Sequence, residues 1–377
     1  MKKQKRNYSI VGIILILIIV GGVISFNSQK EQETIKIGAL YPLTGGLAEF
    51  GEAAQHATEL AIEDINNNGG INGNKLVVEY QDHQCDSQTA KTIFEQMNKI
   101  QGINVFSSAA CSGTVLTVGP LLGDANSVWI GTIVTNPSIT GVSPNLFRNW
   151  AADNKQAVLF SDKIKEIGWT KLGIINEETD YARGLRISLE QDLKETDIQI
   201  SGESFVPSAT DVRTQITKLQ NFEPDCLFIS PQTVTAGDKV LKQMTEMGFN
   251  PETIFVNEII LKSTQLLGQY PILEGSYGAD YLFEKNDQFN ELMNRYKDEF
   301  GVSCPQENIC AGVYDAINIL AKAMKEVGDN PQEIRDYIKT IDYDGISGDI
   351  NFDSNNDRSN ADYTLFRIEN KTAVQIK

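Results

Sequence analysis

Hydroxyl groups and a thiol are concentrated directly after the apolar run INVF at positions 103–106. Within eight positions the sequence carries the following side chains among small neighbours: Ser107, Ser108, Cys111, Ser112 and Thr114. Three kinds of chemistry use such groups at the end of a buried strand, namely a nucleophile, a disulfide at a chain corner, or a cradle for an anion. The rest of the sequence must distinguish between them.

A second strand end of the same kind lies at TIVTNP, positions 132–137, where the apolar run SVWIGTIV finishes. In open parallel sheets, ligands bind outside the carboxyl ends of the strands. Hydroxyl groups and helix N-termini bind anions at such places, so the two strand ends indicate a carboxylate or phosphate ligand. The same residue types are also ordinary helix caps, and these residues alone leave both interpretations open.

The chain alternates predicted strands and helices, which is typical of parallel sheets covered by helices on both faces. The first round occupies positions 34–134 in the order β-α-β-α-β-α-β, and a second round occupies 171–258. Between them, the segment SPNLFRNWAADN at positions 143–154 predicts a crossing from one unit to the other.

The C-terminal part of the sequence predicts further helices at 286–301 and 311–328, followed by two or three short strands between 349 and 377. A tail that covers one of the two units requires the chain to cross between them more than once. The sequence therefore predicts an α/β protein with two similar lobes.

The first 30 residues have a different character from the rest. MKKQKR carries four positive charges, and the uncharged apolar run at 7–26 follows it. Its length is near the lower end of the ~17–25 residues that span a bilayer, and its flank is basic. We therefore expect either a cleaved signal peptide or an uncleaved membrane anchor, with the remainder of the chain outside the cytoplasm.

The chain is strongly acidic, with a formal net charge of −17. The first 30 residues hold five basic and no acidic residues, so the remainder has 28 basic against 50 acidic residues, a charge of −22. Phosphate backbones repel such a surface, which argues against nucleic acid as a partner. The charge suits a soluble exported domain.

The five cysteines show no spacing typical of a zinc site, and we expect no metal. Outside the cytoplasm, cysteine pairs become disulfides. Cys304 and Cys310 flank a short loop and could close a small ring, whereas Cys226 lies in an apolar run and is expected to be an inert core thiol. The segment 353–358 resembles a calcium loop but lacks its glycine and terminal glutamate.

Enzyme motifs are missing from the sequence. It contains no G-x-S-x-G elbow, no P-loop and no glycine-rich dinucleotide fingerprint. Only His56 and His83 could serve as a histidine base, and neither is placed convincingly for one. We therefore expect a protein that is not an enzyme and uses no cofactor.

The order of motifs along the chain resembles the leucine/isoleucine/valine-binding type of solute receptors. The resemblance begins with IKIGALYPLTGGLAEFGEAAQHATELAIEDINNNGGINGNKLVVEYQD and continues through ACSGT, VTNPSIT, DYARG and GDINFD. It implies the type I periplasmic-binding-protein fold, with two Rossmann-like lobes whose parallel sheets are joined by three crossing segments. We expect residues 34–150 and 281–342 in lobe 1, and 151–280 and 343–377 in lobe 2.

The resemblance implies a site for a zwitterion. Ser112 matches the serine that holds the α-carboxylate, and Thr135 matches the threonine that contacts both carboxylate and amine. Ile133 falls where a backbone carbonyl accepts from the α-ammonium, and Glu258 where an acid pairs with it. Tyr181 matches the aromatic residue that closes over the ligand from the second lobe.

Three further positions are carried over toward the ligand's side chain. Phe50 replaces an aromatic residue near that pocket, Gln232 stands where some members have tyrosine, and Tyr314 is expected near the cleft. In the resembled family, cysteines at the positions of Cys85 and Cys111 form a disulfide. That pairing would mean that the segment after the first strand end is both a disulfide corner and an anion cradle. It would exclude Cys111 as a nucleophile.

The expected function is that of an extracytoplasmic solute-binding protein. It would capture an amino acid, an amide or a similar small molecule by hinge closure and deliver it to the permease of an ABC importer. A ligand-sensing ectodomain that signals through a separate membrane partner is the alternative with the same fold.

Overall fold

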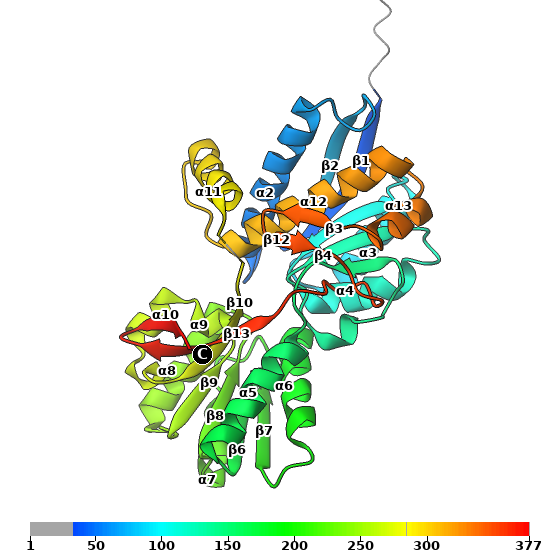
Figure 1. The fold of residues 1–377 in the computed structure, drawn as a ribbon. Coiled ribbons are helices and arrows are strands. Elements are labelled where there is room, and N and C mark those ends of the chain that lie inside the picture. Colours follow the sequence, from blue (N-terminus) through cyan, green and yellow to red (C-terminus); the bar gives the residue numbers. More distant parts are fainter. Residues whose placement is uncertain (1–32, 284, 377) are drawn as a thin grey trace, which may run out of the picture.

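The computed structural model describes residues 33–283 and 285–376, which form two α/β lobes, one above the other in Figure 1. The predicted signal peptide or anchor at residues 1–30 lies outside the described residues. Within the described part, no helix is both long enough and apolar enough to cross a bilayer.

The first lobe is built on a fully parallel five-stranded sheet in the order β2-β1-β3-β4-β5. Its strands are β1 (Thr34–Tyr41), β2 (Lys75–Asp82), β3 (Val105–Ala109), β4 (Val128–Thr132) and β5 (Leu146–Arg148). All five residues of β3 and of β4 are buried, as expected of central strands covered on both faces. This lobe confirms the predicted parallel sheet.

Helices cover both faces of the first sheet, and the lobe includes late segments of the chain (Figure 1). These are α2 (Ala48–Asn67), α3 (Ser87–Lys99), α4 (Ser112–Val118), α11 (Asp287–Phe300), α12 (Glu307–Val327) and α13 (Pro331–Ile338), with short 3-10 turns η1 (Gly119–Leu121) and η2 (Pro137–Ile139). The buried alanines of α2 (Ala53, Ala54, Ala57 and Ala61) share one core cluster with residues of α12. Small side chains permit this close helix packing.

The second lobe contains a seven-stranded sheet in the order β14-β13-β10-β9-β8-β6-β7. Its strands are β6 (Lys171–Glu177), β7 (Gln199–Phe205), β8 (Cys226–Ser230), β9 (Thr253–Val256), β10 (Tyr277–Tyr281), β13 (Tyr363–Glu369) and β14 (Thr372–Gln375). Its helices are α5 (Asp153–Ile167), α6 (Asp180–Leu193), α7 (Arg213–Phe222), α8 (Val234–Met247), α9 (Glu258–Leu261), α10 (Thr264–Gln269) and η3 (Pro271–Leu273). Strands β13 and β14 are the antiparallel edge.

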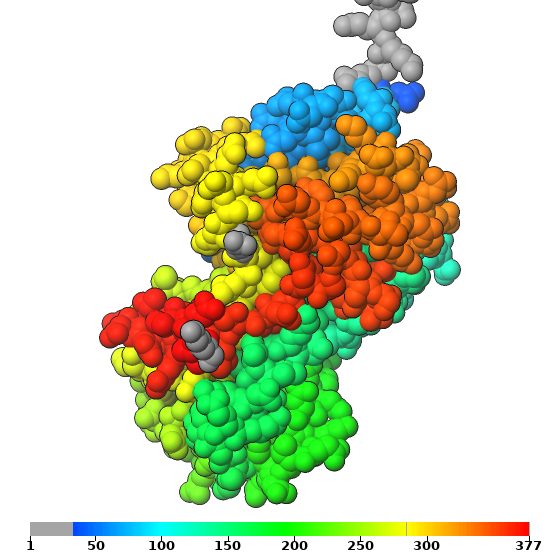
Figure 2. All heavy atoms as spheres, in the orientation of Figure 1, coloured from blue at the N-terminus to red at the C-terminus, as the bar shows by residue number. Residues whose placement is uncertain are grey.

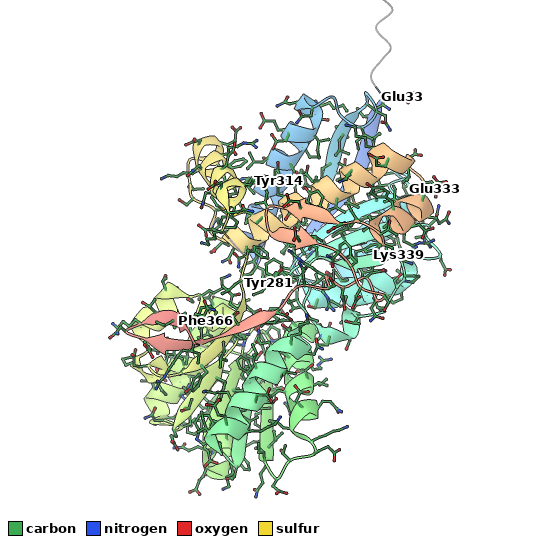
Figure 3. All side chains as sticks on the ribbon, in the orientation of Figure 1. Glu33, Tyr281, Tyr314, Glu333, Lys339 and Phe366 are labelled. Carbon is green, nitrogen blue, oxygen red and sulfur yellow. A yellow bond between two sulfur atoms is a disulfide. The ribbon has the colours of Figure 1, made fainter. Side chains whose placement is uncertain are left out.

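Three segments connect the lobes and meet in one aromatic cluster. Trp150 on the first segment packs edge-on against Tyr281 and Phe283 on the second, with ring centroids 5.0 and 5.1 Å apart. The Arg358 guanidinium on the third segment lies 5.7 Å from the centroid of the Tyr281 ring. Figure 3 shows Tyr281 at the waist between the lobes, and Figure 2 shows the third segment crossing the surface there.

The third crossing begins later than the predicted boundary at residue 343. The hairpin of β11 (Tyr343–Gly345) and β12 (Gly348–Ile350) adds Ile350 to the core of the first lobe. Its turn is tied to α12, because the Asp315 carboxylate accepts hydrogen bonds from the backbone N–H groups of Ile346 and Ser347 at 2.9 and 2.8 Å. The structure thus places this hairpin with lobe 1, where the sequence prediction had assigned it to lobe 2.

A buried ion pair holds the third crossing against the first lobe. Arg148, at the end of β5, donates from Nε and Nη2 to the two carboxylate oxygens of Asp357, at 2.8 and 2.6 Å. The same guanidinium donates to the backbone carbonyl of Asn136 at 3.0 Å. Asp357 belongs to the segment that resembles a calcium loop, and its structural partner is Arg148.

Candidate functional site

The two hydroxyl-bearing strand ends lie side by side. In the first sheet β3 pairs with β4, and Ala109 is the register partner of Thr132, so the chains leave the sheet at the same edge. Ser112 and Thr135 follow these ends, and each is only 2% exposed. The two strand ends are linked directly, because the backbone N–H of Asn136, the residue after Thr135, donates to Ser112 Oγ at 3.2 Å.

The backbone around this edge is held in unusual conformations. Ala110 and Cys111 both have φ of 61°, and Ile133 has φ of 52°. A β-branched residue in the left-handed region is disfavoured by contacts of its Cβ, at a cost of about 1–3 kcal/mol. Such strain concentrates at ligand sites, and here it turns the chain so that Ser112 begins α4 and the segment at Ile133 lines the cleft.

A small cavity brings the strand ends together with residues of the second lobe. Seven of the eight residues predicted to bind the ligand line it: Phe50, Ser112, Ile133, Thr135, Tyr181, Gln232 and Glu258. Leu47 and Ile259 add apolar wall. The cavity shares Phe50 and Glu258 with a larger hollow farther out in the cleft, so the site is continuous with solvent.

The second-lobe end of the cavity is built around a buried carboxyl group. Glu258 is the first residue of α9, and Tyr181 at the start of α6 donates its hydroxyl to Glu258 Oε1 at 2.7 Å. Gln156 Nε2 donates to the other carboxylate oxygen at 3.2 Å. Asn257 in turn donates to the Tyr181 hydroxyl at 3.0 Å. Burial raises the pKa of Glu258 above its usual range.

Sequence reasoning missed a second buried acid beside this end. Asp153, the first residue of α5, accepts from Thr135 Oγ1 at 2.7 Å and from the Tyr363 hydroxyl at 2.9 Å. Burial, followed by the nearby charge of Glu258, raises the pKa of Asp153 to about 8. The sequence signal was an acid just after the first crossing, in AADN, but its partners Thr135 and Tyr363 are distant in the chain.

The cleft therefore has two ends of opposite hydrogen-bonding character. At one end the Ser112 hydroxyl accepts from a backbone N–H, and within the described residues its own proton has no acceptor. At the other end, Glu258 supplies carboxylate oxygen atoms, and Thr135 lines the cavity in front of the buried Asp153. A donor end and an acceptor end in one small cavity fit a molecule that carries a carboxylate and a cationic nitrogen.

A model of the periplasmic binding protein family matches residues 34–373. The chain belongs to this family. It is 23% identical over 371 residues to the leucine-, isoleucine-, valine-, threonine- and alanine-binding protein of Pseudomonas aeruginosa, covering 95% of this chain and 96% of that protein.

Several solved structures with the same fold contain bound ligands. The branched-chain amino acid transporter substrate binding protein LivJ from Streptococcus pneumoniae, in complex with isoleucine, has a TM-score of 0.74 and 22% identity, covering 91% of this chain and all of that one. A solute binding protein of an ABC transporter from R. palustris, in complex with benzoate, has a TM-score of 0.77 and 14% identity, covering 91% and 95%. The type I periplasmic-binding-protein fold is thus confirmed.

In this periplasmic binding protein, the two lobes touch across the cleft beside the cavity. Asn136 of the first lobe donates from Nδ2 to the backbone carbonyl of Asp180, at the start of α6, at 2.6 Å. Gly184 makes room for that side chain, because a Cβ there would lie 2.5 Å from the Asn136 amide. Gln232 also reaches across, with Nε2 3.5 Å from the sulfur of Cys85.

Two disulfides are present in the described structure. Cys85 pairs with Cys111, as the resemblance implied, and fixes the loop that precedes Ser112. Cys304 pairs with Cys310 and closes the small ring that the sequence allowed. Cys226 is free and buried, and burial raises the pKa of its thiol, so it is the inert core residue that was expected.

Tyr314 is the one predicted ligand residue that the structure places elsewhere. It lies on α12 within the first lobe, where its hydroxyl donates to Asp64 Oδ2 at 2.6 Å, and Figure 3 shows it well above the waist. Asp64 also forms an ion pair with Arg295 at 2.7 Å. The helix was identified correctly, but the tyrosine faces α2 and α11 and not the cleft.

Neither histidine lies in the cavity. His56 stacks on Phe300 with ring centroids 3.8 Å apart. His83 is buried, its Nδ1 accepts from the backbone N–H of Cys85 at 3.0 Å, and burial lowers the pKa of its imidazole to about 4. Among the described residues, no cluster of histidine, cysteine or acidic side chains is arranged to hold a metal ion.

Proposed function

We propose that this protein is the solute-binding component of an ABC importer and that it captures an amino acid in the cleft between its lobes. The observation that carries the proposal is the opposed polarity of the cavity, with the Ser112 hydroxyl at one end and the Glu258 carboxylate at the other. A relative of the same length is named as an amino-acid-binding protein, and the family is extracytoplasmic by name.

The head group of the amino acid would bridge the two ends. The α-carboxylate accepts from Ser112 and the α-ammonium donates to Glu258 and to the carbonyl of Ile133. Charge-assisted hydrogen bonds contribute about 1.5–3 kcal/mol each. Two or three of them, with burial of an apolar side chain against Phe50, are enough for a micromolar Kd, which corresponds to about −8 kcal/mol.

Ligand capture proceeds by hinge closure about the three crossing segments. The aromatic cluster around Trp150 and Tyr281 lies at the pivot, while Tyr181 and Gln232 lie on the lobe that moves toward Ser112. A ligand that contacts both lobes stabilises the closed arrangement and shifts the population toward it. The permease would recognise the closed form, and the N-terminal segment would either direct export or retain the protein at the membrane.

A thermal-shift panel tests this function. We would compare leucine, isoleucine, valine, threonine, alanine, amides, urea and benzoate. A ligand at about 100 times its Kd stabilises the folded state by about 2.7 kcal/mol, which is readily measured. A shift with at least one amino acid that is lost in Glu258→Gln supports the proposal. No shift with any amino acid contradicts it.

An aromatic carboxylate is the second candidate, because the cavity walls include Leu47, Phe50 and Ile259 and a relative of the same fold was solved with benzoate. Such a ligand needs the Ser112 end and not the acidic end. A shift with benzoate that Glu258→Gln leaves unchanged would favour it over an amino acid. The sensor ectodomain is not favoured, since the relatives are named as transport or binding proteins.

A further inference from the structure

The carboxyl groups of Asp153 and Glu258 are both buried at the same end of the site, and neither has a cation beside it among the described residues. Within residues 33–283 and 285–376, neither Asp153 nor Glu258 forms an ion pair. The charge of Arg148 acts on Asp153, but the Arg148 guanidinium is already paired with Asp357. Burial of an unpaired carboxylate is costly, so this end of the cavity favours a bound proton or a cationic ligand.

The Thr135 hydroxyl connects Asp153 to the cavity. It has one proton, and Thr135 Oγ1 donates that proton to Asp153 Oδ2 at 2.7 Å. While Asp153 is ionised, Thr135 can therefore offer only lone pairs to the ligand. Tyr363 likewise gives its hydroxyl proton to Asp153 Oδ1, so both partners of the carboxylate act as donors toward it. Thr135 lines the cavity, whereas Asp153 lies behind it.

Protonation of Asp153 would reverse this arrangement. With its proton on Oδ2, the carboxyl donates its own O–H to Thr135 Oγ1, and the threonine proton then turns toward the cavity. The cavity end would present a donor where an ammonium group needs an acceptor. Gln156 Oε1 is a further acceptor at this end. It is buried and has no hydrogen-bond donor among the described residues.

We propose that Asp153 is a positioning residue that sets the hydrogen-bond polarity of Thr135, so that its ionised form admits an ammonium-bearing ligand and its protonated form rejects one. The inference rests on the proposed function for the identity of the site and adds that ligand binding expels a proton. Carboxylates without an ammonium group do not depend on this switch.

The charged and titratable groups around Asp153 and Glu258 include some that favour ionisation of these carboxyl groups and some that oppose it. On Asp153, Arg148 of β5 favours ionisation, while Glu258 of α9 opposes it. On Glu258, Asp280 of β10 opposes ionisation, and Lys262 holds Asp280 in an ion pair at 3.4 Å. The two tyrosines Tyr181 and Tyr363 stay neutral, because burial raises the pKa of each well above its usual range.

The first arm of the test needs no ligand. Infrared difference spectra of the ligand-free protein between pH 7 and pH 9 should show loss of the carbonyl stretch of a protonated carboxyl, since the pKa of Asp153 is raised to about 8. Burial raises the pKa of Asp315, another buried acid, to about 6, so Asp315 titrates mostly below this window. The signal should be lost in Asp153→Asn and retained in Asp162→Asn, an exposed acid on the same helix.

The second arm measures binding by calorimetry with leucine and with 4-methylpentanoate, which lacks only the ammonium group. One proton linked to binding makes leucine affinity rise about tenfold per pH unit between pH 6 and 7 and level off above about 8. The desamino compound should show no such rise. In Asp153→Asn the leucine affinity should rise less steeply across this range than in the parent protein, because only Glu258 is left of the two buried acids, and in Asp162→Asn it should keep the full slope.

The outcomes separate this inference from the proposed function. Equal pH slopes for both compounds, or a slope for leucine that Asp153→Asn leaves unchanged, overturn the inference. The first of these results is measured on the parent protein and does not depend on whether a variant folds. If leucine binds at no pH, the proposed function fails for leucine. The infrared measurement is then the only test of the inference about Asp153. An infrared signal that Asp153→Asn removes then supports the switch, and the absence of a titrating signal overturns it.

Discussion

Substitution of Gly184 by alanine should weaken closure of the cleft without weakening either lobe. The added Cβ would lie 2.5 Å from Cγ and Nδ2 and 2.8 Å from Oδ1 of Asn136. Ordinary carbon contacts are about 3.5–4.0 Å, so the Asn136 side chain must move by roughly 1 Å. It is not free to do so, since Nδ2 donates to the Asp180 carbonyl at 2.6 Å and Oδ1 accepts from the backbone N–H of Ser138 at 2.8 Å.

Gly184→Ala has two opposing effects, one on the stability of α6 and one on the contact between the lobes. Alanine is about 0.8–1.0 kcal/mol better than glycine inside a helix, which stabilises α6 and the second lobe. Loss of one or both hydrogen bonds of Asn136 costs about 1 kcal/mol each, and the bond to Asp180 joins the lobes. We therefore expect closure to become less favourable by about 1–2 kcal/mol, which is a five- to thirtyfold rise in Kd.

Two measurements check this prediction. Small-angle scattering should give a larger radius of gyration for Gly184→Ala than for the parent protein, and calorimetry should show the weaker binding, while the thermal midpoint of the ligand-free protein stays equal or rises. Gly268→Ala is the matched control, because it also lies in a helix and its Cβ would meet nothing within 4 Å. Unchanged scattering and affinity in Gly184→Ala would refute the reasoning.

Three further predictions concern stability. Replacing Cys85 and Cys111 together by serine removes a link across 26 positions, which the loop-closure model values at about 3.5 kcal/mol, and a drop in the urea midpoint should report it. Asp357→Ala leaves the buried Arg148 unpaired and should destabilise by about 3–5 kcal/mol in the same assay, with a much smaller loss for the exposed Asp362→Ala. The raised pKa of Asp153 makes the folded state bind more protons than the unfolded state between pH about 4 and about 8, so ligand-free stability should fall as pH rises through this range, and Asp153→Asn should flatten the fall. A steeper pH dependence in Asp153→Asn, or wild-type midpoints for either of the other variants, would contradict these accounts.

The parts of the site that follow strand ends were predictable from the sequence. Ser112 and Thr135 come after two apolar strands that are consecutive in the parallel order, and neighbouring strands bring their carboxyl ends to one edge. The residues carried over from the resembled family, such as Glu258 and Tyr181, also reach the cavity. Local pattern and chain order were sufficient here because the sheet converts order directly into proximity.

Contacts between distant segments were not predictable in this way. Asp153, Gln156 and Tyr363 support the site from behind. Tyr363 lies 210 positions from Asp153 in the chain, and the antiparallel strand β13 brings it there. The prediction for Tyr314 was wrong for a related reason. The helical period fixes which residues share a face of the helix but not which face meets the cleft. The hairpin of β11 and β12 was assigned to the other lobe because short strands carry no mark of the sheet or core they join.

The most direct test of the account compares leucine with one compound that lacks its ammonium group and one that lacks its carboxylate group. Calorimetry at pH 8 would measure leucine, 4-methylpentanoate and 3-methylbutylamine against the parent protein, Ser112→Ala and Glu258→Gln. We predict that leucine binds far more tightly than either half, that Ser112→Ala weakens leucine and the acid but not the amine, and that Glu258→Gln weakens leucine and the amine but not the acid. If both variants bind all three compounds like the parent, the cavity between Ser112 and Glu258 does not bind an amino acid head group.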